Sequence, residues 1–140
     1  MRVVLDANVL ISARLSPLGA SARLLGAFTD GRFELVLSPG LLDELAGVLA
    51  REKFRRWLTE QEAIAFIAAL RAQATIVQDP PATPGTTVDP DDDYLIALAH
   101  AAGADYLISG DQHLTRLTNP RPPVLTPRAL LQQLDQSQPQ

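Results

Sequence analysis

Two short apolar runs, each closely followed by an aspartate, constrain the fold of this chain most. Residues 3–5 precede Asp6, and residues 106–108 precede Asp111 after a Ser-Gly step. A strand that is apolar on both faces must be buried on both, which is typical of parallel sheets covered by helices. The pattern predicts an α/β domain in which both aspartates lie at the carboxyl end of the sheet. Such folds bind their ligands at that end.

The remaining apolar pattern alternates between strands and helices. Strands are expected at residues 3–5, 33–37, 74–77, 106–109 and 124–125. Helices are expected at residues 20–28, 39–49, 60–73, 90–102 and 128–134. Ser38 and Thr59 are placed as N-caps, because Pro39 follows the first at the first helical position and Glu62 completes a capping box with the second. Strands alternating with helices predict a mainly parallel sheet.

Length and composition predict one globular domain. The chain has 140 residues, of which 46% are hydrophobic and 20% charged, so one sizeable core is possible. We expect the domain to span residues 1–134 and residues 135–140 to form a disordered tail. The chain contains no cysteine, which excludes disulfides and thiolate metal sites. No apolar run is long enough for a membrane span and no signal peptide precedes the first strand, so a cytoplasmic location is expected.

The charge balance does not predict a broad surface for nucleic acid. The formal net charge is −4, whereas non-specific binding to nucleic acid depends on basic side chains. The basic residues gather most densely at residues 51–56, next to Trp57. This segment is a candidate RNA contact, and the alternative is an ordinary solvated helix end.

Four acidic residues are candidates for one metal site: Asp6, Glu44, Asp92 and Asp111. The two in predicted helices lie on or beside the apolar face rather than on the solvent face. Two carboxylates about 4–5 Å apart repel each other by roughly 3–4 kcal/mol at an effective dielectric constant of about 20. A divalent cation would offset that repulsion, and oxygen-only ligands suit magnesium or manganese. The arrangement indicates metal-assisted phosphoryl chemistry.

Each of these residues also has a purely structural interpretation. Asp6 and Asp111 could be N-caps of short turns or helices. Glu44 lies beside the apolar arc of its helix and could simply pack its stem there.

The acidic run at residues 89–93 could serve as a cap that complements the helix dipole. Asp92 is preferred as the site residue because it shares a helix face with Leu95 and Ala99. Asp93 and Asp89 are second candidates.

In this order and spacing, the motifs resemble those of the PIN domain family, the nuclease fold of the VapC-like toxins of toxin–antitoxin systems. The matching segments are residues 3–12, 37–45, 89–99, 103–111 and 124–127. Together they extend over nearly the whole chain. A single Asp-x-Asn is weak evidence, whereas four motifs in the right order are specific.

The resemblance implies a three-layer αβα sandwich and a ribonuclease that depends on Mg²⁺ or Mn²⁺. It implies that Asp6, Glu44, Asp92 and Asp111 are the catalytic and metal-binding carboxylates. Asn8 and Ser109 match accessory polar positions, with Ser109 able to offer its hydroxyl to a metal-bound water or a phosphate. It also implies an RNA substrate, a small antitoxin partner and a homodimer.

Three alternatives remain at the level of sequence. A phosphatase with a phosphorylated strand-end aspartate would need a second aspartate two residues later, where Asn8 stands, or a lysine at a strand end. The only lysine is Lys53, in a helical segment. The chain could instead be a PIN-like nucleic-acid-binding module, or a nuclease acting on DNA, because metal ligands contact phosphate rather than the 2′-hydroxyl.

Overall fold

A five-stranded parallel sheet forms the centre of the computed structural model, which describes residues 1–81, 90–118 and 120–136. The strand order is β3-β2-β1-β4-β5. The strands are β1 (Arg2–Leu5), β2 (Glu34–Leu37), β3 (Thr75–Ile76), β4 (Tyr106–Ile108) and β5 (Val124–Leu125). Every described pair of neighbouring strands is parallel. This confirms the predicted α/β class with flanking helices.

The most apolar strand, β1, occupies the middle of the sheet. Val3 pairs with Leu35 of β2 on one side and with Tyr106 of β4 on the other. Val3 and Val4 are fully buried, as a strand covered on both faces requires. The register brings the end of β1 level with the end of β4, because Leu5 pairs with Ile108.

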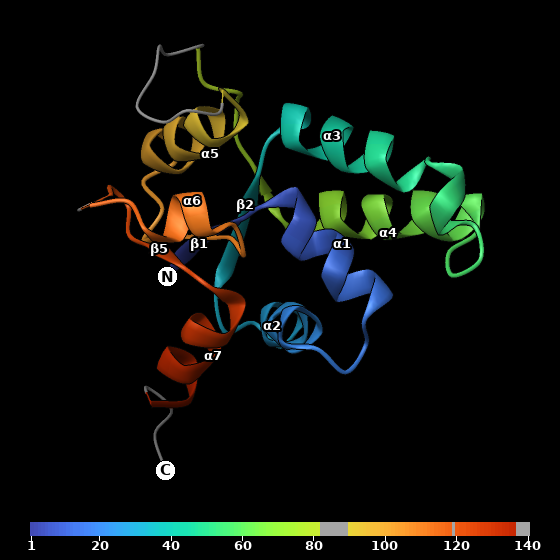
Figure 1. Cartoon of the computed structure of the whole chain (residues 1–140), viewed down its shortest axis with the longest axis horizontal. Coiled ribbons are helices and arrows are strands. Elements are labelled where there is room, and N and C mark those ends of the chain that lie inside the picture. The colour runs from blue at the N-terminus through green and yellow to red at the C-terminus, as the bar shows by residue number, and fades with distance from the viewer. Residues whose placement is uncertain (82–89, 119, 137–140) are drawn as a thin grey trace.

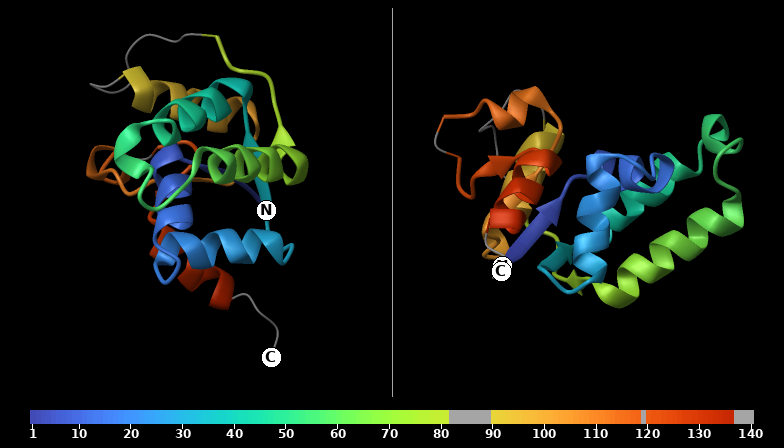
Figure 2. Two further views of the ribbon diagram at one scale, coloured as in Figure 1. Left: turned by 90° about the vertical axis from the view of Figure 1, so that its right-hand side faces the viewer. Right: turned by 90° about the horizontal axis from the view of Figure 1, so that it is seen from below.

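The helices flank the sheet on its two sides (Figures 1 and 2). They are α1 (Ala7–Leu15), α2 (Ala20–Thr29), α3 (Pro39–Leu49), the 3₁₀ turn η1 (Glu52–Phe54), α4 (Glu60–Gln73), α5 (Pro90–Ala101), α6 (Gln112–Thr115) and α7 (Pro127–Gln136). The chain steps from β1 outward to β3 and then crosses β1 to reach β4. Because such crossovers are right-handed, helices α1 to α4 lie on one face of the sheet and helix α5 lies on the other. The direction of winding therefore reverses between β1 and β4.

Two short helices were not among the predicted elements. Helix α1 begins directly after Asp6, and α6 begins directly after Asp111. Helix α1 is buried at residues 7, 9, 10, 11 and 13, so no broad polar face marks it as a helix. Helix α6 has only four residues, which is too short for any periodicity.

Most other boundaries agree with the prediction to within a residue or two. Ser38 caps α3 by accepting from the Leu41 backbone N–H, and Thr59 and Glu62 form the capping box of α4. Helix α7 continues to Gln136, so the first two residues of the expected tail belong to a helix, and residues 137–140 lie outside the described residues. No helix in the described part of the chain combines the length and apolarity needed to cross a membrane.

Candidate metal-binding active site

Asp6 joins the end of β1 to the start of α1. Its backbone N–H donates to the Ile108 carbonyl at 3.0 Å, which continues the β1–β4 pairing. Its carboxylate caps α1, with Oδ1 accepting from the Asn8 backbone N–H at 3.2 Å. The residue is only 9% exposed. The capping interpretation of Asp6 is therefore correct, and it leaves most of the carboxylate's capacity for other partners.

Ser109 forms a hydrogen bond with each of the two strand-end aspartates. Its Oγ donates to Asp6 Oδ2 at 3.0 Å and accepts from the Asp111 backbone N–H at 3.0 Å. The side chain is fully buried. The Ser109 hydroxyl thus donates to Asp6, whereas the sequence suggested that it could be offered to a metal-bound water or a phosphate. Ser109 fixes the separation between the two aspartates.

Asp111 is the second carboxylate at this edge and caps α6. Its Oδ1 accepts from the His113 backbone N–H at 2.8 Å. The residue is half-buried, whereas His113 itself is exposed.

The electrostatics of Asp6 indicate an incompletely compensated negative charge. Burial raises the pKa of Asp6 above its ordinary value, and the nearby charge of Asp111 raises it further. The hydrogen bonds from Asn8 and Ser109 act in the opposite direction without cancelling the effect. A buried carboxylate in this state favours a proton or a cation.

Both aspartates open into a cleft of about 450 Å³. Its described lining residues are Asp6, Asn8, Val9, Ser12, Ser21, Gly110, Asp111 and Pro127. None of these is basic, so no internal cation neutralises the pair there. The cleft lies outside the carboxyl ends of β1 and β4, where the winding of the sheet reverses, which is the usual ligand position in open α/β sheets.

Glu44 and Asp92 lie on helices α3 and α5. Glu44 is exposed on α3, and its charge contributes to raising the pKa of Tyr94 on α5. Asp92 is 6% exposed on α5, in agreement with the helix face predicted for it. Neither is a lining residue of the cleft, and both have interactions with other groups. Asp93 is half-buried, and Asp89 lies outside the described residues.

The donor chemistry suits a hard divalent cation. Asp6 and Asp111, with the Asn8 amide beside them, offer only oxygen ligands of the kind that magnesium and manganese prefer. Across residues 1–81, 90–118 and 120–136, however, no three His, Cys, Asp or Glu side chains gather closely enough to hold a metal ion. The described structure thus brings two of the four predicted carboxylates together in one cleft.

A second polar cluster, which the sequence did not predict, connects the start of α3, the segment after β3 and helix α5. The Tyr94 hydroxyl donates to Asp79 Oδ1 and lies 2.5 Å from Ser38 Oγ. The Asp79 carboxylate also accepts from the Gly40 backbone N–H, at 3.0 Å and 3.1 Å. We call Ser38, Gly40, Asp79 and Tyr94 the α3–α5 link. It couples the start of α3 to α5, the two helices that carry Glu44 and Asp92.

The link leaves a clear electrostatic signature. The hydrogen bond from Tyr94 is the main cause of the lowered pKa of Asp79. Burial, followed by the Asp79 hydrogen bond, raises the pKa of Tyr94 to about 12. Tyr94 therefore keeps its proton at neutral pH. No local pattern marks Asp79, because its partners lie far away in sequence.

The basic segment at residues 51–56 lies away from the cleft, at the end of α3 farthest from β2 (Figure 1). The Arg55 guanidinium donates to the carbonyls of Leu58 and Leu49, at 2.9 Å and 2.7 Å. This arginine therefore has a structural role at the end of α3. The segment is a weaker candidate for an RNA contact than its composition suggests.

Comparison with known proteins identifies the family. The sequence profile of the PIN domain family matches residues 2–113. This chain therefore belongs to the PIN domain family, a family of nucleases that generally use divalent metals.

One curated relative is the uncharacterized protein MJ1680 of Methanocaldococcus jannaschii. It is 27% identical over 117 residues, which cover 84% of this chain and 75% of the relative.

Two solved structures share the fold. PAE2754 from Pyrobaculum aerophilum superposes with a TM-score of 0.67 at 15% identity, covering 98% of this chain and 97% of that one. The crystal structure of VapBC2 from Rickettsia felis bound to a DNA fragment from their promoter contains a chain with a TM-score of 0.63 at 13% identity. That match covers 90% of this chain and 98% of the other.

Proposed function

We propose that this protein is a metal-dependent endoribonuclease that hydrolyses RNA phosphodiester bonds. The observation that carries the proposal is the pairing of Asp6 and Asp111 through Ser109, in a cleft whose described lining contains no basic side chain. Such a pair is suited to binding a cation together with a phosphate. The family membership supports the same conclusion.

Asp6 and Asp111 would hold Mg²⁺ or Mn²⁺, and Glu44 and Asp92 would complete the acidic set. A bound divalent ion supplies a nucleophilic water of lowered pKa and offsets charge on the phosphoryl oxygens. The chain's own contribution is positional. Ser109 and the Asn8 backbone N–H hold Asp6 in place, and the caps of α1 and α6 fix both aspartates at the strand ends.

The test is cleavage of a mixed single-stranded RNA pool with Mn²⁺, with Mg²⁺ and with EDTA. We expect metal-dependent cutting that Asp6→Asn and Asp111→Asn each abolish, while Asp43→Asn, an exposed neighbour of Glu44, retains it. Retained cutting in both of the first two variants would contradict the proposed site. Glu44→Gln and the pair Asp92→Asn and Asp93→Asn test the helix carboxylates and decide which α5 aspartate acts.

A parallel arm with single-stranded DNA addresses the second candidate function. The Rickettsia felis VapBC2 structure includes promoter DNA, and phosphate-directed ligands do not exclude DNA as a substrate. Equal cleavage of both polymers would replace ribonuclease with a general nuclease.

We further propose that the protein is the toxin of a toxin–antitoxin pair, on the strength of its resemblance to VapC-like proteins. Co-expression with the product of an adjacent small gene should restore growth that the isolated protein inhibits. The homodimer and the cytoplasmic location stay predictions. Light scattering of the purified protein tests the first, and cell fractionation tests the second.

A further inference from the structure

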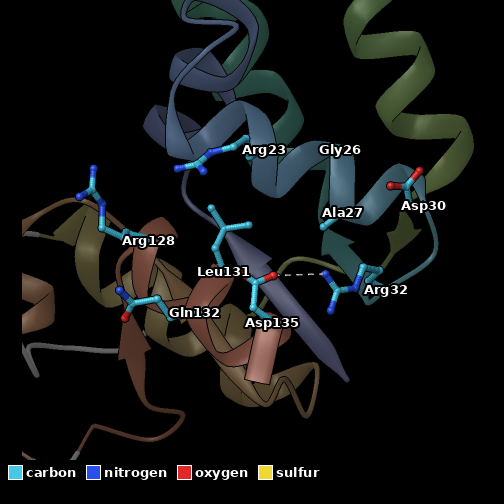
Figure 3. Close-up of a pocket in the computed structure, with 9 residues that line it drawn as sticks. All are labelled: Arg23, Gly26, Ala27, Asp30, Arg32, Arg128, Leu131, Gln132 and Asp135. Carbon is cyan, nitrogen blue, oxygen red and sulfur yellow. Dashed lines mark ion pairs between the residues drawn. The ribbon is translucent and has the colours of Figure 1, made fainter. Parts of the chain in front are cut away.

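A second cleft, of about 570 Å³, lies between α2 and α7 (Figure 3). The two helices pack against each other. The charged and polar residues that matter in its lining are Arg23, Asp30, Arg32, Arg128, Gln132 and Asp135. Three of these are arginines, in a chain whose formal net charge is −4. A local concentration of arginine in an acidic protein calls for an explanation.

The two ends of this cleft differ. At one end Arg32 Nη1 pairs with Asp135 Oδ1 at 3.8 Å, and Arg32 Nη2 donates to the Leu134 carbonyl at 2.5 Å. Arg23 and Arg128 project from α2 and α7 at the other end (Figure 3). Both are exposed. Among the described residues, neither guanidinium group has an ion pair or hydrogen bond. These two guanidinium groups are therefore available to a ligand.

The arginine end adjoins the acidic cleft. Ser21 and Pro127 line the acidic cleft, and Arg23 and Arg128 follow them on the same two helices. At about 1.5 Å of rise per residue, Arg23 lies only about 3 Å further along α2 than Ser21. Both helices then lead away from the carboxylates toward Asp30 and Asp135. The sequence of charges along this path is acidic, basic and then mixed.

We propose that Arg23 and Arg128 form a phosphate-binding subsite that holds a single-stranded RNA next to the bond being cleaved. The inference rests on the proposed function, because it assumes that the scissile phosphate lies at Asp6 and Asp111. Guanidinium groups bind phosphate oxygens with two parallel hydrogen bonds. Asp30 and Asp135 disfavour further phosphates at the far end, which limits the subsite to the backbone segment nearest the carboxylates.

The experiment compares Arg23→Gln, Arg128→Gln and the double variant with Arg71→Gln, which removes an exposed arginine from α4 instead. Glutamine keeps a high helix propensity, and melting curves check that each variant folds. Binding of a fluorescein-labelled single-stranded RNA is measured by anisotropy in EDTA, between about 50 and 200 mM salt. Cleavage of the same RNA is measured with Mn²⁺.

Each lost phosphate contact should make the negative slope of log K against log salt shallower by about 0.7, and weaken binding about fivefold at 0.1 M salt. The double variant should therefore have a slope of log K against log salt that is shallower by about 1.4, and should bind RNA about 25-fold more weakly. Arg71→Gln should match the wild type. Arg23→Lys with Arg128→Lys should retain the wild-type salt slope, because the charge is kept, but lose part of the affinity, because an ammonium cannot form the two parallel hydrogen bonds.

The outcomes separate the two proposals. If the wild type cleaves RNA and the double variant binds it as tightly as Arg71→Gln, the subsite is wrong and the nuclease stands. If nothing is cleaved but the double variant loses affinity in EDTA, the nuclease proposal fails, and the two arginines are RNA contacts without a place beside a scissile phosphate, which overturns the subsite in the form proposed. If the wild type neither binds nor cleaves RNA, both are overturned.

Discussion

At the scale of single residues, Asp6 serves two opposed requirements. It caps α1, which stabilises the fold, but it places a negative charge in a buried position beside Asp111. Asn8 and Ser109 compensate that charge only in part. A side chain with this conflict is typical of a functional site rather than of a structural one.

Asp6→Asn should therefore reduce activity and stabilise the metal-free protein. Asparagine caps helices about as well as aspartate, while the buried charge is removed. We expect RNA cleavage to be abolished, because the substitution removes a charged metal ligand. Urea denaturation in EDTA at neutral pH should show a higher midpoint for the variant, and a lower midpoint would contradict the electrostatic argument.

The same pKa shift predicts how the stability difference depends on pH. The folded-state pKa of Asp6 is raised, so the folded protein holds this proton more tightly than the unfolded chain. Below the ordinary value of 3.8 the carboxyl is protonated in both states, and the shift has no effect. As pH rises from 3.8 through the raised pKa, the wild type loses stability relative to Asp6→Asn. Denaturation curves across that window should show the difference increasing with pH.

Tyr94→Phe tests the α3–α5 link by removing one hydroxyl. The Asp79 carboxylate and Ser38 Oγ would each lose a partner in a partly buried position, at a cost of about 1–3 kcal/mol in the free energy of unfolding. Activity should fall as well, because α3 and α5 carry Glu44 and Asp92.

Tyr106→Phe is the matched control for that substitution. Its hydroxyl donates to Gln133 at 2.8 Å in an exposed position, so its loss should change stability by less than about 0.5 kcal/mol. Thermal melts and cleavage rates of both variants would decide the matter. Equal changes in stability and cleavage rate for Tyr94→Phe and Tyr106→Phe would contradict a role of the α3–α5 link in holding the two helices.

At the scale of elements, the α3–α5 link leaves no room for a side chain at Gly40 of α3. A Cβ there would lie 2.6 Å from Asp79 Oδ1 and 3.0 Å from the Tyr94 hydroxyl oxygen. Gly47 in the same helix has no such neighbour within 4 Å. The two glycines therefore form a natural pair for comparing helix propensity with a steric requirement.

Gly40→Ala should destabilise the protein by about 1–3 kcal/mol, because the added methyl group forces Asp79 or Tyr94 away. Gly47→Ala should stabilise it by up to about 1 kcal/mol through helix propensity alone. Chemical denaturation of the two variants gives the comparison directly. A stabilising effect of Gly40→Ala would show that Asp79 and Tyr94 can move apart from α3 with little loss of stability.

The elements also show where prediction from sequence succeeds. The strands β1 and β4 and the caps at Ser38 and Thr59 were predictable, because each has a strong local signal. Helix α1 is buried on most sides and exposes only a narrow polar stripe at Asn8 and Ser12, and Asp79 acts through residues remote in sequence. Such features depend on tertiary contacts that no local pattern encodes.

At the scale of the whole molecule, a bound metal should act as a stabiliser. A ligand that binds only the folded protein adds about 2.7 kcal/mol when its free concentration is about 100 times its Kd. Mn²⁺ or Mg²⁺ should therefore raise the melting temperature of the wild type. Asp6→Asn and Asp111→Asn should lose most of that increase, and an equal increase in all three proteins would place the metal elsewhere.

The family match ends at residue 113, before α7 begins. One wall of the α2–α7 cleft therefore comes from the part of the chain beyond the matched region. The paired aspartates, in contrast, were predictable from the sequence, because Asp6 directly follows a buried strand and Asp111 follows another after a Ser-Gly step.

The hydrogen bond between Ser109 and Asp6 joins residues 103 positions apart. Closing so long a loop is entropically costly, and chains rich in such distant contacts fold slowly. The central pairing of β1 with β4 is subject to the same constraint. The reactive edge is thus assembled only when the two halves of the chain have met. Recovery of cleavage after refolding should report completion of the entire sheet, later than signals from the locally formed helices α3 and α4.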